Sequence, residues 1–163
     1  MKNRVLLALA LLSSACSEGN LPGIPGARYS AGPSGHCPAE VAFAVSTFVV
    51  TWADRYPDTV MPDHVRTMHF ETVETAWFRG EALVRGETLS RQHIRYALRG
   101  AVMQPEVQSI ATTALIHELV HAALWVDTGD PDAAHKTPEF RDLLDVVEAR
   151  IRAAADALDL CTP

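Results

Sequence analysis

The amino-acid sequence predicts an α+β domain, because segments with helical spacing of apolar residues lie on both sides of a middle region in which apolar residues alternate. The chain has 163 residues, of which 48% are hydrophobic and 21% charged, and this composition suits one globular domain with its own core. We expect an N-terminal helix, a small sheet of three to four mainly antiparallel strands, a second helix that carries the chemistry and a C-terminal helix.

The first sixteen residues have the layout of an export signal. A basic start precedes the apolar run 5–12, and small residues then lead to Cys16. Because a membrane-spanning helix needs roughly 20 apolar residues, we expect residues 1–15 to be a signal peptide that is removed. The layout resembles a bacterial lipoprotein signal, which implies a lipid on Cys16, membrane contact through that lipid and a place in the cell envelope. Cleavage after Ala15 without lipidation, giving a periplasmic or secreted protein, is the alternative.

The charge balance argues against a nucleic-acid partner. The chain has 14 Lys+Arg and 20 Asp+Glu, a formal net charge of -6. An acidic chain repels a phosphate backbone. We therefore expect no binding to nucleic acid.

The three cysteines leave an odd number to account for. A lipid on Cys16 would leave the thiols of Cys37 and Cys161 in an oxidising compartment, where they could pair. We expect this disulfide, with two unpaired thiols as the alternative. The bond would close nearly the whole mature chain into one loop and so restrict its unfolded state.

Residues 17–36 contain five Gly and three Pro and few large apolar side chains. Such a stretch buries too little surface to offset the entropy of ordering it. We expect residues 16–36 to be a flexible tether and residues 37–163 to form the folded domain. The first helix of that domain is predicted from Pro38, which suits a first helical turn, and from an apolar stripe that ends near Pro57.

The region between Val65 and Arg99 shows a period of two instead. Apolar residues alternate with other residues over 73–77 and again over 94–98, and glycines separate these stretches. A meander of short strands, each paired with the next along the chain, is the simplest arrangement of this pattern.

Two further helices are predicted after the strands. The second helix should run from Pro105 to about Val126, and its apolar residues point in nearly every direction around the axis, so we expect it to be buried. The third should begin near Thr137 and Pro138, which are a favourable N-cap and first-turn residue, and its apolar stripe continues to Leu158.

The second helix contains His117, Glu118 and His121. Residues four apart lie on one helical face about 6 Å apart along the axis, so both imidazoles can reach one ion about 2.0–2.1 Å from each. Glu118 is turned about 100° from His117 and lies beside the ion rather than on it. This is the HExxH arrangement of zinc metallopeptidases, in which the carboxylate is the catalytic base for a metal-activated water.

A third protein ligand is needed, because a catalytic zinc ion takes three of them and keeps one position open. His135, in the loop between the second and third helices, is the expected third ligand. Its rivals are the nearby acidic side chains Asp127, Asp130, Asp132 and Glu139.

The second half of the chain resembles the SprT-like zinc metallopeptidases. In that family the motif helix reads much as residues 117–125 do here, and a third His follows shortly before a Pro-x-Phe helix start, matched by His135 and residues 138–140. The likeness covers roughly residues 94–144. It implies one Zn²⁺ per chain and hydrolysis of peptide bonds.

Together these features predict a zinc-dependent endopeptidase of the cell envelope that acts on a protein or peptide. The alternative is a non-catalytic envelope lipoprotein in which zinc stabilises a binding module, although such a site has no need of Glu118. A substrate must lie extended to present its peptide bond, and we expect strand 94–98 or its neighbour to be the sheet edge to which it adds.

Overall fold

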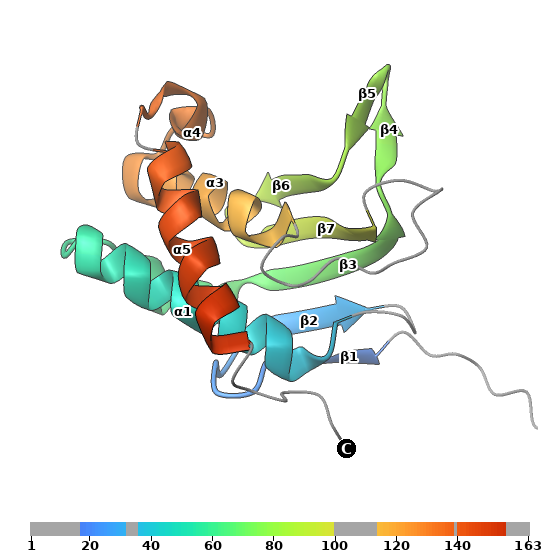
Figure 1. Ribbon diagram of the computed structural model, residues 1–163, viewed down its shortest axis with the longest axis horizontal. Helices are drawn as coiled ribbons and strands as arrows, with labels where there is room; N and C mark the ends of the chain where they lie inside the picture. Colours follow the sequence, from blue (N-terminus) through green and yellow to red (C-terminus); the bar gives the residue numbers. More distant parts are fainter. Residues whose placement is uncertain (1–16, 32–35, 100–113, 139, 156–163) are drawn as a thin grey trace, which may run out of the picture.

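The computed structural model describes residues 17–31, 36–99, 114–138 and 140–155 and has an α+β fold, which confirms the predicted class. The helices are α1 (Pro38–Arg55), α2 (Met61–His64) with the 3-10 turn Val65–Thr67, α3 (Ala114–Thr128), α4 (Ala133–Lys136) and α5 (Phe140–Ala155). The strands are β1 (Ser17–Asn20), β2 (Arg28–Ala31), β3 (His69–Thr75), β4 (Trp77–Arg79), β5 (Ala82–Val84), β6 (Gly86–Ser90) and β7 (His93–Arg99). The long helices α1, α3 and α5 gather on one side of the main sheet (Figure 1).

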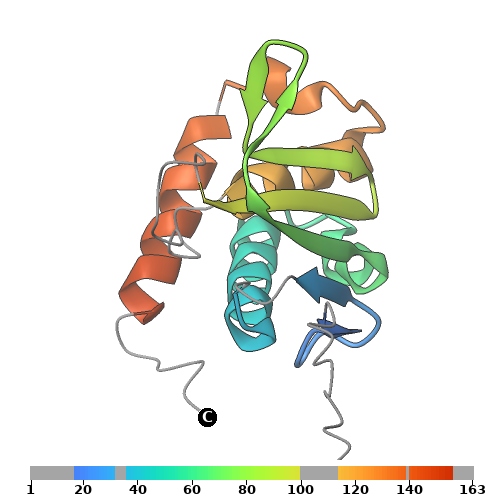
Figure 2. The same ribbon diagram turned by 90° about the vertical axis from the view of Figure 1, so that its right-hand side faces the viewer.

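The main sheet has five strands in the order β1-β2-β3-β7-β6. The outer strands β1 and β6 pair antiparallel with their neighbours, whereas β3 is parallel to both β2 and β7. The prediction of three to four mainly antiparallel strands in a meander is therefore wrong. Residues 76–92 leave the sheet through the projecting hairpin β4–β5 and return through β6 (Figure 2), which provides the crossover that a parallel β3–β7 pair requires.

The edge of the sheet on the side of β7 is formed by β6 and not by β7 itself. Residues 94–98 belong to β7, which is paired on both sides, so they do not form the expected edge. The neighbouring strand β6 is paired only with β7 in the part of the chain that the structure describes. Since β6 also packs against α3, the edge runs beside the helix that carries His117 and His121.

Residues 17–31 fold into the sheet, so the flexible tether expected over 16–36 is wrong for this segment. β1 and β2 form a hairpin that turns Leu21 and Tyr29 into the core. Glycine here serves a tight turn rather than flexibility: Gly26 has φ 89, and a Cβ on it would lie 2.6 Å from the carbonyl oxygen of Arg66. Composition was misleading because a short segment with few apolar residues can add them to a core built by the rest of the chain.

Helix α1 begins at Pro38, as the sequence predicts. The backbone N–H of Cys37 donates to Glu40 Oε2 at 3.1 Å, which satisfies a polar group at the helix start. The predicted apolar stripe, which includes Phe48 and Trp52, lies in the core.

Cys37 is disulfide-bonded, as expected for one half of the predicted pair. Cys16 and Cys161, the other cysteines of the chain, lie outside the described residues. Pairing with Cys161 and lipidation of Cys16 therefore stay predictions.

Helix α3 is the buried helix that the sequence predicts. Leu115, Ile116, Leu119 and Val120 are fully buried, and the helix packs on β6 and β7 as well as on α1 and α5. The predicted start near Pro105 lies outside the described residues. Because α3 has neighbours on so many sides, its polar residues His117, Glu118 and His121 lie on the side that borders a cleft.

Helix α5 packs against α1 and α3 and contributes Leu143, Val147 and Ile151 to the same core. The predicted continuation of its stripe to Leu158 lies outside the described residues. Like the other described helices, α5 does not combine the length and the apolar character needed to cross a membrane.

Candidate metal centre

His117 and His121 lie one turn apart on the side of α3 that borders a cleft. Their Nε2 atoms are 3.0 Å apart, and their ring centroids are 4.8 Å apart. Two nitrogen ligands of one tetrahedral zinc ion, each about 2.0–2.1 Å from it, would lie about 3.3 Å from one another. The two rings therefore face a common point, at a separation that suits one shared ion.

The cleft has a volume of about 500 Å³ and is bordered by four stretches of chain. Helix α3 contributes both histidines and Glu118, β6 contributes residues 86–89, and the segment before and within α4 contributes Asp132 and His135. Arg79 of β4 also borders the cleft, where its guanidinium pairs with Glu87 Oε1 at 2.8 Å. The cleft is thus a polar groove between the sheet edge and the HExxH helix.

His135 lies on α4, beside the pair formed by His117 and His121 on α3. Its ring centroid is 4.9 Å from that of His121, with the two ring planes at 61°. Gly129, with φ 79, turns the chain back after α3, and Lys136 Nζ braces the returning segment by pairing with Asp130 Oδ2 at 2.6 Å. Within the described residues, however, no three His, Cys, Asp or Glu side chains already converge as a metal-binding group. A third ligand is therefore still a prediction, and His135 is a candidate adjacent to the pair.

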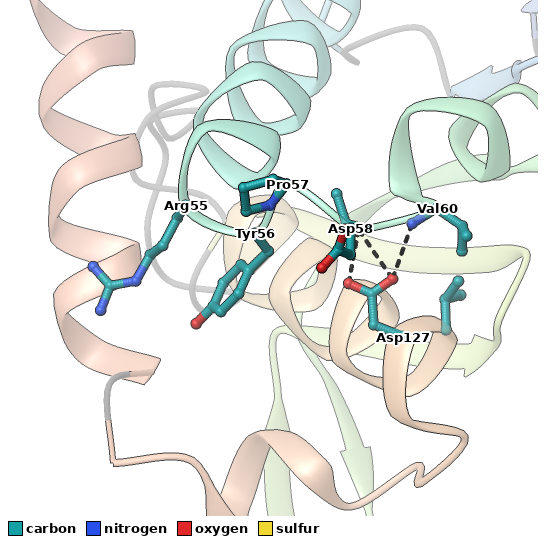
Figure 3. A pocket seen from close by; sticks show the side chains of 8 residues that line it. Arg55, Tyr56, Pro57, Asp58, Val60 and Asp127 are labelled. Atoms are coloured by element: carbon teal, nitrogen blue, oxygen red, sulfur yellow. Dashed lines mark hydrogen bonds between the residues drawn. The ribbon is translucent and has the colours of Figure 1, made fainter.

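The four acidic rivals of His135 are placed differently. Asp127 is not among the residues that border the cleft and borders a separate cavity of about 410 Å³ (Figure 3). Its carboxylate accepts hydrogen bonds from Trp52 Nε1 at 3.0 Å, Thr59 Oγ1 at 2.7 Å and the backbone N–H of Val60 at 3.3 Å. Asp127 therefore anchors α3 to the end of α1 and is no longer a ligand candidate.

The remaining acids are Asp130, Asp132 and Glu139. Asp130 is engaged by Lys136, whereas Asp132 borders the cleft with the three histidines. Glu139 lies outside the described residues. Asp132 is thus the described carboxylate that competes with His135 for the third position.

Glu118 is buried beside the pair, with 6% of its surface exposed. Its Oε2 accepts a hydrogen bond from Thr88 Oγ1 on β6 at 2.8 Å. Burial raises the pKa of the carboxyl to about 7, against the opposing effect of the hydrogen bonds with Thr88. A carboxyl group whose pKa lies near neutrality can accept and return a proton at the pH of most cells.

The imidazoles of His117 and His121 are held in the form that binds metal. Burial, together with the positive charges that His117 and His135 would carry, lowers the pKa of His121 to about 4. Burial and the proximity of His135 lower the pKa of His117 in the same way. Neutral imidazole offers a free nitrogen lone pair to a cation, whereas protonated imidazole does not.

Phe140, the first residue of α5 and the Phe of the Pro-x-Phe helix start, lies against the histidine pair, a contact that the sequence did not predict. Its ring lies edge-on to those of His117 and His121, with centroid distances of 4.9 and 5.4 Å. Its place on the apolar stripe of the third helix indicated only a core residue. Because the contact joins separate helices, no local spacing in the sequence reveals it.

No family model matches this chain, and neither a curated protein nor a solved structure matches it. The resemblance to SprT-like metallopeptidases therefore rests on the residues of the motif helix, on His135 and on residues 138–140.

Proposed function

We propose that this chain is a zinc-dependent endopeptidase. The observation that carries the proposal is the pair of Nε2 atoms of His117 and His121, which face each other at 3.0 Å with the buried carboxyl of Glu118 in the same cleft. Imidazole nitrogens suit zinc, and a purely structural zinc site has no use for a buried carboxyl beside it.

His117 and His121 would hold the ion, with His135 as the third ligand and Asp132 as its competitor. The chemistry that zinc supplies when bound is Lewis-acid assistance to the attack of water on a peptide carbonyl. Neutral imidazole side chains leave the ion its full positive charge, which favours that role over a site closed by several carboxylates.

Glu118 would move the proton. Its carboxylate takes a proton from the attacking water as oxygen bonds to the peptide carbon, and returns it to the nitrogen of the leaving amine as the C–N bond breaks. Glu118 is next to His117 in the chain and borders the same cleft. The carboxyl would therefore be near both the attacking water and the leaving nitrogen.

The substrate would lie extended along β6. Within the described chain, the outer side of this strand has no strand paired with it, and we propose that the peptide adds there as a further strand. Such a peptide would run along the cleft that contains His117 and Glu118.

The cell envelope is the proposed location. The signal peptide 1–15 and Cys16 lie outside the described residues, so this part of the proposal rests on their sequence. The disulfide at Cys37 supports it, because disulfides persist mainly in oxidising compartments outside the cytoplasm.

Metal analysis and a cleavage assay on one preparation test the proposal. We expect the purified mature chain to carry about one zinc per chain and to cleave an unstructured protein, with loss of cleavage on adding a chelator and recovery on adding zinc. Glu118→Gln should retain the metal and lose cleavage. Glu148→Gln on α5, a half-buried carboxylate paired with Arg152, should retain both.

Two negative outcomes of these assays lead to different conclusions. Zinc without turnover on any of a broad set of peptides would favour the binding-module alternative. A chain that neither retains zinc nor cleaves would refute the proposal altogether.

A further inference from the structure

The edge strand β6 approaches the carboxyl of Glu118 unusually closely at Gly86. A Cβ at this glycine would lie 2.7 Å from Ala114 Cβ and 2.8 Å from both Cγ and Oε1 of Glu118. Gly86 is not among the glycines with positive φ, so its backbone does not require glycine. The missing side chain is instead what makes room for the Glu118 side chain.

Two residues further along β6, Thr88 holds the same carboxyl. Its hydroxyl lies 2.8 Å from Glu118 Oε2 and 3.1 Å from the backbone carbonyl oxygen of Glu118. Residues two apart in a strand point to the same face, so Gly86 and Thr88 together present a gap and a hydrogen-bonding group to one side chain of α3.

We propose that Thr88 is a positioning residue that holds the Glu118 carboxyl toward the cleft, in the space that Gly86 leaves open. This inference rests on the proposed peptidase function. It extends that function by assigning to the edge strand a second role beside substrate binding, namely the orientation of the proton carrier.

A hydroxyl group suits this task in both states of the carboxyl. While Glu118 is a carboxylate, Thr88 donates its hydrogen to Oε2. Once Glu118 has taken up a proton, Thr88 Oγ1 can accept from the carboxyl O–H and donate its own hydrogen to the Glu118 carbonyl oxygen 3.1 Å away. The contact therefore persists through the transfer, whereas an apolar side chain of the same shape would lose it in both states.

Three threonine variants test the role of the hydroxyl. Thr88→Val keeps the shape of the side chain and removes the hydroxyl, and Thr88→Ser restores the hydroxyl on a smaller side chain. Thr72→Val is the matched control, since Thr72 is a buried threonine of β3 that donates to Ser30 O at 3.3 Å, outside the set of residues bordering the cleft.

We expect Thr88→Val to lower kcat about 10- to 100-fold, because a misplaced reacting group costs rate rather than affinity. KM should stay within about two-fold, and Thr88→Ser should recover kcat to within about three-fold of the wild type. Thr72→Val should leave both constants unchanged. The zinc dissociation constant, measured by competition with a chelator, should be the same in every variant, because Thr88 acts on Glu118 and not on the metal ligands.

A measurement on the metal-free protein tests the contact without any turnover. The carboxyl carbon resonance of Glu118, assigned by its absence in Glu118→Gln, should shift in Thr88→Val, stay in place in Thr72→Val and return toward its original position in Thr88→Ser.

The possible failures are separable. Wild-type protein that shows no turnover would overturn the proposed function and this inference with it. Active wild type together with a Thr88→Val variant of unchanged kcat, or with an equal loss in Thr72→Val, would overturn the positioning role and leave the peptidase proposal standing.

Discussion

Trp52 Nε1 on α1 donates a hydrogen bond to Asp127 Oδ2 at the end of α3, at 3.0 Å. This bond links a helix that packs Phe48 and Trp52 into the core with the helix that carries His117 and His121. Because both helices are also packed on their neighbours, the two imidazoles are presented from a fixed base, whereas the proposed third ligand, His135, depends on the turn after α3.

The first prediction concerns the third zinc ligand. We expect His135→Ala to weaken zinc binding at least about 100-fold, because a catalytic zinc site is built on three protein ligands. Asp132→Asn should change the affinity only slightly. Chelator competition with a zinc-sensitive dye measures both, and circular dichroism checks that the fold is kept. Loss of zinc from Asp132→Asn with retention in His135→Ala would assign the third position to Asp132 instead.

The motif could be found in the sequence because its geometry is local. The spacing of His117 and His121 fixes their relative position once the segment is helical, and an apolar surface on all sides of that segment indicates burial. Helix α1 was predicted for the same reason, since Pro38 and the stripe that follows it lie within one element.

The features that the sequence did not predict all depend on pairing between distant segments. The parallel β3–β7 pair, the inclusion of residues 17–31 in the sheet and the contact of Thr88 with Glu118 join parts of the chain that are far apart. A threonine in a strand is ordinary in any sheet, so nothing marked Thr88. His135 was identified by type, but its placement depends on the turn after α3.

The second prediction is that stability falls on acidification through Glu71. Partial burial raises the pKa of Glu71, but the hydrogen bond and charge of Arg95, together with His93, outweigh it and hold the pKa below its ordinary value of 4.5. A carboxyl whose pKa is lowered in the folded state stabilises that state above its ordinary pKa, and the contribution is lost as the pH falls through the lowered value.

Thermal unfolding at a series of pH values measures this effect. The melting temperature of the wild type should fall as the pH drops below 4.5. Glu71→Gln should melt at a lower temperature at neutral pH and show a smaller decrease on acidification. Glu74→Gln serves as the control. Glu74 lies on β3 with Glu71, is more exposed than Glu71 and pairs with Arg99. An equal acid dependence in wild type and Glu71→Gln would contradict the assignment.

The third prediction compares two glycines. Gly86→Ala should lower the free energy of unfolding by about 1–3 kcal/mol, because its Cβ would overlap Ala114 and Glu118 and force β6 and α3 apart. At Gly19 on β1 an added Cβ meets nothing within 4 Å, so Gly19→Ala should change stability by less than about 0.5 kcal/mol. Urea unfolding of the metal-free protein measures both. Equal effects at the two positions would mean that β6 does not need its close approach to α3.

The fourth prediction concerns Asp127, whose carboxylate accepts hydrogen bonds from Trp52, Thr59 and Val60. Asp127→Ala removes the acceptor and leaves the indole N–H of the buried Trp52 without its charged partner, which should destabilise the fold by about 1–3 kcal/mol. Asp127→Asn keeps one acceptor oxygen and should lose less. Asp58→Ala, an exposed carboxylate beside the same cavity (Figure 3), should have almost no effect.

Zinc binding separates this structural role from a role as ligand. Because Asp127 faces the cavity at the end of α1 and not the cleft, Asp127→Ala should bind zinc as tightly as the wild type at a temperature where both are folded. A variant that is folded yet has lost the metal would return Asp127 to the set of zinc ligands. It would also imply that the end of α3 turns toward the cleft when the ion binds.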